Sequence, residues 1–186
     1  MNKEKDLVIS FPVNIAATIK AVVFSIISIF SFFVPFTLGH PQWLVGSIVN
    51  ACLFLGAIYL PKKYFIPLAI LPSLGVLARG VIFGPFTFIL FYFLPIIWIG
   101  NFLLIVIFTK LFSKKNYAFS LFGASATKFL FLLIAAFIYF KFSIVPAIFL
   151  QAMGLNQLAT ALAGGLIAWL IFYAYRKRYA RSKRVA

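Results

Sequence analysis

The sequence predicts a compact all-α bundle of about six membrane-crossing helices in a single domain spanning residues 1–186. Hydrophobic residues make up 65% of the 186-residue chain and charged residues only 10%, so a soluble core of this size could not hide the apolar surface. The only two carboxylate side chains, Glu4 and Asp6, lie within the first six residues. The long apolar body therefore contains no acidic side chain.

Prolines, glycines and charged residues divide the chain into stretches of about the 20 apolar residues that a helix needs to cross a bilayer. We expect helices near 12–38, 43–60, 63–79, 87–112, 117–140 and 154–175, followed by a basic cytoplasmic tail at 176–186. Lys20 interrupts the first stretch and no small-residue cleavage site follows it. The first stretch is therefore expected to be a retained helix rather than a signal peptide.

The region after the third stretch departs from a simple bundle, because residues 80–112 would span about 50 Å as one helix. Gly84 and Pro85 indicate a break, which favours a lid or partial helix at 80–94 before the crossing is completed. One long tilted helix with a kink at Pro95 is the alternative.

The basic residues orient these helices. If the N-terminus is cytoplasmic, Arg79 and Lys141 lie on the outer side, and Lys20 and Lys128 lie within the membrane. The other thirteen lie on the inner side: Lys3, Lys5, Lys62, Lys63, Lys110, Lys114, Lys115, Arg176, Lys177, Arg178, Arg181, Lys183 and Arg184. This bias predicts a multi-pass protein of the cell membrane with both termini in the cytoplasm.

Several function classes are disfavoured. The net charge of +15 comes from residues at the ends of apolar segments, where they bind lipid headgroups, so no nucleic-acid partner is expected. His40 and Cys52 are the only histidine and cysteine, so no metal site is recognisable. An intramembrane enzyme would need a nucleophile and a base, so we expect neither catalysis nor a cofactor.

Lys128 is the most informative polar residue, because it lies about 11 residues into the fifth stretch, far from either interface. Its spacing places it on one helix face with Ser125, Leu132 and Ala135. A buried ammonium needs an anion or several oxygens, and no carboxylate is nearby in the sequence. Lys128 is therefore a candidate ligand for an anionic solute; the alternative is that it snorkels or bonds to carbonyl and hydroxyl oxygens.

Other polar residues gather toward the outer side. Arg79 could bind a carboxylate or phosphate, or anchor the helix at the lipid headgroups. For Asn50 and Asn101, hydrogen bonds between helices are the alternative to a role in binding. The complete set of candidate substrate-binding residues is Lys128, Arg79, Asn50, His40, Gln42, Asn101, Gln151, Asn156 and Gln157.

Small residues recur at four-residue spacing on two helices. The first helix carries Ala17, Ala21 and Ser25, and the last carries Ala161, Gly165 and Ala168, with Gly164 beside them. Such stripes allow helices to approach closely in lipid, either within one chain or between chains.

These features together resemble the substrate-binding S components of energy-coupling factor (ECF) transporters. The resemblance rests on the six-helix pattern, the Ala17-x-x-x-Ala21 stripe, and the segments GHPQWLVGSIVN at 39–50, PSLGVLAR at 72–79 and IGN at 99–101. The segments are similar to those of a subgroup of small bacterial membrane proteins.

The resemblance implies that the first helix docks, through Ala17, Ala21 and Ser25, on a transmembrane T component coupled to two cytoplasmic ABC ATPases. It also implies that a small, vitamin-like solute is captured in the outer half of the membrane. The alternative is a non-catalytic assembly or scaffold subunit, which requires only packing stripes.

Overall fold

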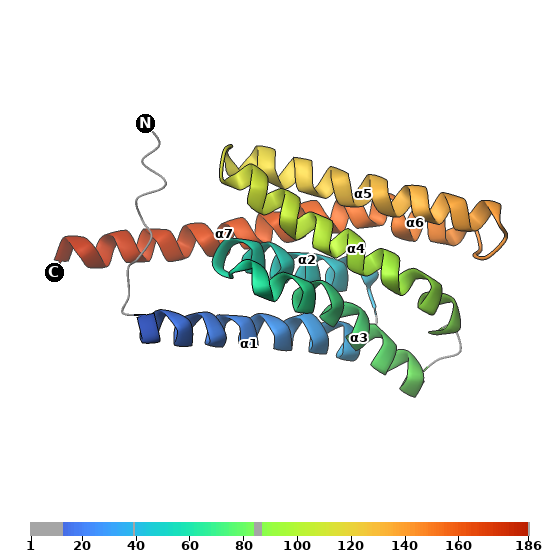
Figure 1. Cartoon of the computed structure of the whole chain (residues 1–186), viewed down its shortest axis with the longest axis horizontal. Helices are drawn as coiled ribbons and strands as arrows, with labels where there is room; N and C mark the ends of the chain where they lie inside the picture. The colour runs from blue at the N-terminus through green and yellow to red at the C-terminus, as the bar shows by residue number, and fades with distance from the viewer. Residues whose placement is uncertain (1–12, 39, 84–86, 186) are drawn as a thin grey trace.

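The computed structural model describes residues 13–38, 40–83 and 87–185 (Figure 1), and every regular element among them is helical. The elements are α1 (Val13–Thr37), α2 (Gln42–Tyr59), the 3-10 turn η1 (Lys62–Tyr64), α3 (Phe65–Phe83), α4 (Thr87–Phe112), α5 (Tyr117–Lys141), the short α6 (Ile148–Met153) and α7 (Leu155–Val185).

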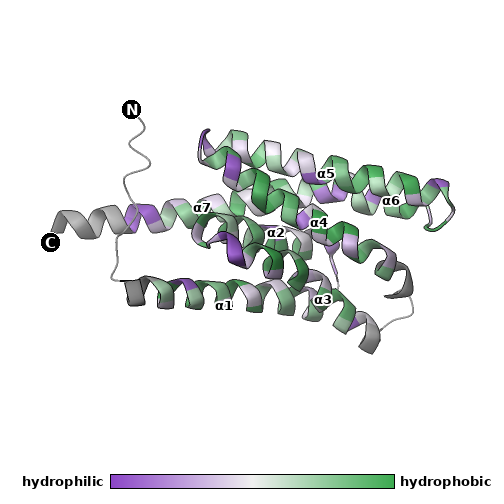
Figure 2. Ribbon diagram, viewed as in Figure 1, coloured by the Kyte–Doolittle hydropathy of each residue, from purple (hydrophilic) through white to green (hydrophobic). Residues whose placement is uncertain are grey.

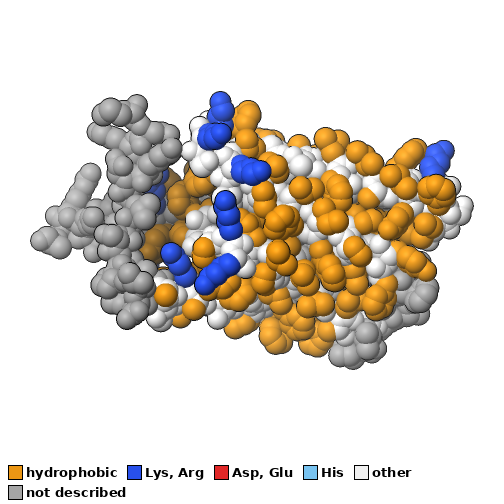
Figure 3. Space-filling view, in the orientation of Figure 1, with side chains coloured by type: hydrophobic (Ala, Val, Ile, Leu, Met, Phe, Trp, Pro, Cys, Tyr) orange, Lys and Arg blue, Asp and Glu red, His pale blue; other side chains and the backbone are white. Residues whose placement is uncertain are grey.

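Five helical segments of the described chain are long and apolar enough to cross a membrane. They are Ala17–Thr37, Gln42–Tyr59, Phe91–Phe112, Tyr117–Lys141 and Ile148–Arg178. Hydrophobic residues dominate the ribbons of the bundle, and the surface seen in Figure 3 is largely apolar (Figures 2 and 3). The predicted all-helical fold with apolar, membrane-length helices is thus confirmed.

The helix bounds lie close to the predicted ones, and α4 begins and ends at the predicted residues 87 and 112. The described residues within 80–94 belong to α3 and α4 and form no separate lid. Residues 80–83 complete α3, and 87–94 form the first turns of α4, which continues through Pro95 to Phe112. Membrane helices tolerate an internal proline, so Pro95 does not end α4. The predicted break at Gly84 and Pro85 lies outside the described residues.

The predicted end of the last helix near residue 175 is wrong, since α7 continues to Val185. Residues 176–185 contain neither glycine nor proline and are rich in Arg and Lys, which favour helix. The basic segment at the end of the chain is therefore helical.

Helix α2 lies at the centre of the bundle, in contact with α1, α3, α4 and α7. Its residues Leu53 and Phe54 are fully buried, and Phe54 packs edge-on against Phe108 of α4. Helix α1 lies at the edge, where it packs on α2 and α3 (Figure 1). One long face of α1 is consequently left without a partner within the described chain.

The two ends of the bundle differ in charge. The first turn of α1 and the last turn of α7 lie at the same end (Figure 1). Most of the Lys and Arg side chains visible in Figure 3 gather near that end. In the sequence, Lys62 and Lys63 follow α2, Lys114 and Lys115 follow α4, and residues 176–178 of α7 are also basic. At the opposite end, α5 finishes with Lys141.

Candidate functional site

Lys128 lies inside the bundle, with only 2% of its surface exposed. Helix α5 is fixed at its start by Asn116, whose side chain accepts a hydrogen bond from the Phe119 backbone N–H at 2.9 Å. Three turns later, the helical period turns Lys128 inward together with Ser125 and Leu132, both fully buried. The sequence-predicted face thus points into the protein rather than to lipid.

A chain of hydrogen bonds connects Lys128 to two other helices. Its Nζ donates to Asn50 Oδ1 on α2 at 2.8 Å. Asn50 Nδ2 donates to Thr160 Oγ1 on α7 at 3.3 Å and to its own helix at Gly46 O at 2.9 Å. Asn50 and Thr160 are 1% and 4% exposed. The structure therefore assembles a buried polar cluster, Lys128–Asn50–Thr160, between α2, α5 and α7.

The cluster leaves hydrogen-bonding capacity unused. An ammonium carries three donors, and among the described residues Lys128 has one acceptor, the neutral amide oxygen of Asn50. The hydroxyl of Ser125, one turn before Lys128, is buried and has no hydrogen-bond partner in the described structure. A solute carboxylate or phosphate would supply both the missing charge and additional acceptors.

Small residues allow α2 and α7 to meet closely around this cluster. A Cβ atom on Gly164 would lie 2.5 Å from Ser47 O and 2.7 Å from Asn50 Cβ. A Cβ atom on Gly46 would lie 2.9 Å from Thr160 Cγ2. The stripe on the last helix is therefore used inside the bundle, where its members Ala161 and Ala168 are fully buried.

Arg79 lies elsewhere and contacts the end of α1. Its Nη1 donates to Thr37 O at 2.9 Å and to Phe36 O at 3.5 Å. The last carbonyls of a helix lack partners within the helix and carry partial negative charge, which a guanidinium stabilises. Arg79 thus joins α3 to α1.

The remaining candidates are divided between the interior and the surface. Asn101 is 2% exposed and donates to Ala69 O at 3.0 Å, which joins α4 to α3. Asn156 and Gln157 are half-buried, and their backbone carbonyls accept from the Thr160 hydroxyl at 2.8 and 3.2 Å. His40, Gln42 and Gln151 are exposed.

Of the predicted binding residues, the structure thus brings together Lys128, Asn50 and the backbone of Asn156 and Gln157. Arg79 and Asn101 make their hydrogen bonds to other helices. Thr160 was missed by sequence reasoning. Its signal is its position four residues before Gly164, on the same face of the last helix as the small residues.

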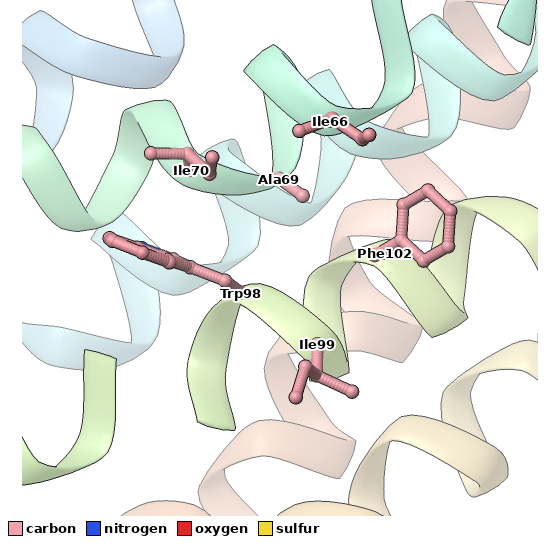
Figure 4. A pocket seen from close by; sticks show the side chains of 6 residues that line it. All are labelled: Ile66, Ala69, Ile70, Trp98, Ile99 and Phe102. Atoms are coloured by element: carbon pink, nitrogen blue, oxygen red, sulfur yellow. The ribbon is translucent and has the colours of Figure 1, made fainter. Parts of the chain in front are cut away.

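An apolar groove opens between α3 and α4 (Figure 4), with a volume of about 280 Å³. Ala69, a small side chain that is 2% exposed, lies between larger ones. The residues that line the groove are Ile66, Ala69, Ile70, Trp98, Ile99 and Phe102.

The stripe on α1 has the opposite environment from the stripe on α7. Ala17, Ala21 and Ser25 are all exposed. Large apolar side chains beside them are exposed as well, among them Val22 at 52% and Ile26 at 51%. The small residues of α1 therefore contribute to an outward-facing apolar surface rather than to packing within the described chain.

Comparison of the chain with protein-family models, with curated proteins and with solved structures finds no match.

Proposed function

We propose that the chain is the substrate-capture subunit, or S component, of an ECF-type transporter in a bacterial plasma membrane. In this proposal α3 is the sixth crossing, and both termini are cytoplasmic. The chain captures a small anionic or polar solute from outside, and two ABC ATPases drive uptake through a T component.

The observation that carries the proposal is the contrast between the two stripes. Side chains and backbone of α2 and α5 pack against the small residues of α7, whereas the small residues of α1 are exposed at the edge of the bundle. Small residues give little contact area to lipid but allow another helix to approach closely. A transmembrane partner docked along α1 would use Ala17, Ala21 and Ser25 in this way.

The buried cluster supports the capture of an anionic solute. Lys128 carries two unused donors among the described residues, and the sequence offers no carboxylate beyond Glu4 and Asp6. The absence of acidic residues from the apolar body also removes the usual means of coupling to protons or sodium. Energy for transport would then come from a partner.

A non-catalytic scaffold subunit is the second candidate. It is favoured by the hydrogen bonds of Lys128, Arg79 and Asn101, which join α5 to α2, α3 to α1 and α4 to α3. A scaffold would share the docking surface on α1 but would bind no solute.

Reconstitution tests the docking surface. The full chain is mixed in lipid nanodiscs with the T component and ATPases of the same cell, and complex formation is measured by size-exclusion chromatography. Ala17→Trp combined with Ala21→Trp should abolish the complex, because the indoles would hold the partner helix away. Leu166→Trp with Leu170→Trp, which adds similar bulk at exposed positions of α7, should leave it intact. A complex that survives the α1 variant would refute docking through this stripe.

A solute screen separates the two candidates. Solute binding to the isolated chain should raise its thermal stability in proportion to the logarithm of solute concentration. A chain that docks through α1 but responds to no anionic or polar solute would be a scaffold.

A further inference from the structure

Two lysines come shortly before the groove residues of α3 in the sequence. Lys62 and Lys63 form the start of η1, and they precede Ile66 by four and three residues. Figure 4 shows Ile66 and Phe102 at one end of the groove. Residues at these spacings lie on one helical face, so Lys62 and Lys63 lie about one turn beyond that end along the helix. Both lysines are exposed.

The distance along the helix axis from Lys62 to Ile66 matches the thickness of the headgroup layer of a bilayer. Four residues of helix rise about 6 Å. The headgroup layer on each side of the hydrocarbon core is about 5–8 Å thick. Lysines at the level of the phosphates therefore place Ile66 and the groove at the adjoining edge of the hydrocarbon.

The shape of the groove suits a linear chain better than a helix. It extends over about one turn of each helix, from Ile66 to Ile70 and from Trp98 to Phe102. One turn is about 5.4 Å, whereas a helix with its side chains is about 10–12 Å wide. The hydrogen bond from Asn101 Nδ2 to Ala69 O, at 3.0 Å, joins the two helices that form the walls of the groove.

We propose that this groove binds an acyl chain of an anionic phospholipid, whose phosphate lies against Lys62 and Lys63. Positive charge about one turn beyond the end of an apolar channel matches the two parts of such a lipid. Lys63 also lies over the Tyr64 ring, with Nζ 5.1 Å from its centroid, which leaves Lys62 as the more available phosphate contact. The site would be distinct from the cluster around Lys128, and it does not depend on the proposed transport function.

Trp98 provides a reporter within the groove, at the end that Ile70 lines (Figure 4). The full chain, carrying Trp43→Phe and Trp169→Phe so that Trp98 is the sole tryptophan, is reconstituted in phosphatidylcholine vesicles. Phosphatidylglycerol with brominated acyl chains, or brominated phosphatidylcholine, is then titrated in, and quenching of Trp98 fluorescence gives their relative affinities.

We expect brominated phosphatidylglycerol to quench at a mole fraction at least five-fold lower than brominated phosphatidylcholine. Each basic residue at an anionic surface contributes about a five-fold preference. Lys62→Gln with Lys63→Gln should abolish the difference, whereas Lys62→Arg with Lys63→Arg should keep it. The matched control, Lys114→Gln with Lys115→Gln, removes two exposed lysines from another connection and should also keep it.

Three results would overturn the proposal. Equal quenching by the two lipids in the parent would mean that only ordinary surrounding lipid reaches the groove. Absence of quenching by either lipid would mean that protein covers it. If the Lys62→Gln, Lys63→Gln variant kept the preference for phosphatidylglycerol, these lysines would not be the groups that bind the phosphate.

Discussion

Replacement of Asn50 by Leu should be among the most destabilising single changes in the bundle. The amide of Asn50 gives Lys128 its one hydrogen-bond acceptor among the described residues, at 2.8 Å, and both side chains are at least 98% buried. Leu is similar in size but cannot accept. The variant therefore leaves a buried ammonium with no partner from α2.

The hydrogen bonds of this pair predict how much each substitution lowers the free energy of unfolding. Removal of one partner of a buried charge costs about 3–5 kcal/mol. Lys128→Met instead leaves only the neutral Asn50 Oδ1 without a donor, at about 1–3 kcal/mol. The double variant removes both groups. It loses chiefly the hydrogen bonds that the Asn50 amide donates to Gly46 and Thr160, each worth about 0.6–1.7 kcal/mol in a membrane protein. The two substitutions should thus be coupled by about 2 kcal/mol or more.

Equilibrium unfolding by sodium dodecyl sulfate in mixed micelles, followed by circular dichroism, measures these values. Asn101→Leu is the matched control, because Asn101 is also 2% exposed but donates only to a backbone carbonyl. Loss of the Asn101 hydrogen bond should lower the free energy of unfolding by no more than about 1.7 kcal/mol. Additive effects of Asn50→Leu and Lys128→Met, with a coupling below about 0.5 kcal/mol, would show that the pair does not interact as described.

Three further outcomes are expected. A cysteine at Ser113 should stay unlabelled by an impermeant reagent in intact cells, whereas one at Ser143 should be labelled; the reverse pattern would contradict the cytoplasmic termini. Gly164→Ala should destabilise the protein by about 1–3 kcal/mol, because its Cβ would meet two backbone atoms of α2 at 2.5 and 2.7 Å. Gly123→Ala should cost less, since its Cβ meets only a mobile leucine end at 2.6 Å, and equal losses would argue against the close α2–α7 contact. If an anionic solute is found, Lys128→Met should weaken its binding by roughly 2–5 kcal/mol in a calorimetric titration, and unchanged affinity would leave Lys128 a structural residue.

The helices could be predicted because their signals are local. The bounds of α4 follow from Pro85 on one side and from the polar residues after Phe112 on the other. The extension of α7 was missed because a basic composition was interpreted as a tail, although its residues favour helix as strongly as many apolar ones.

The site was predictable only in part, because hydrogen-bond partners depend on how the helices pack. Spacing alone placed Lys128 away from both interfaces, and the structure shows that it is buried. Its acceptor, Asn50, lies 78 residues away in the sequence, and Thr160 lies 110 residues from Asn50. Arg79 likewise meets the end of α1 across 42 residues. No local pattern identifies such pairs.

Photo-crosslinking from α1 in living cells tests the central claim most directly. A benzophenone amino acid is placed at Ala21, or, as the control, at the exposed Ile134 of α5. We predict that Ala21 yields a crosslink to the T component, with both ATPases recovered in the same complex, and that Ile134 yields none. Crosslinks to the T component from both positions alike, or from neither, would contradict a docking surface on α1.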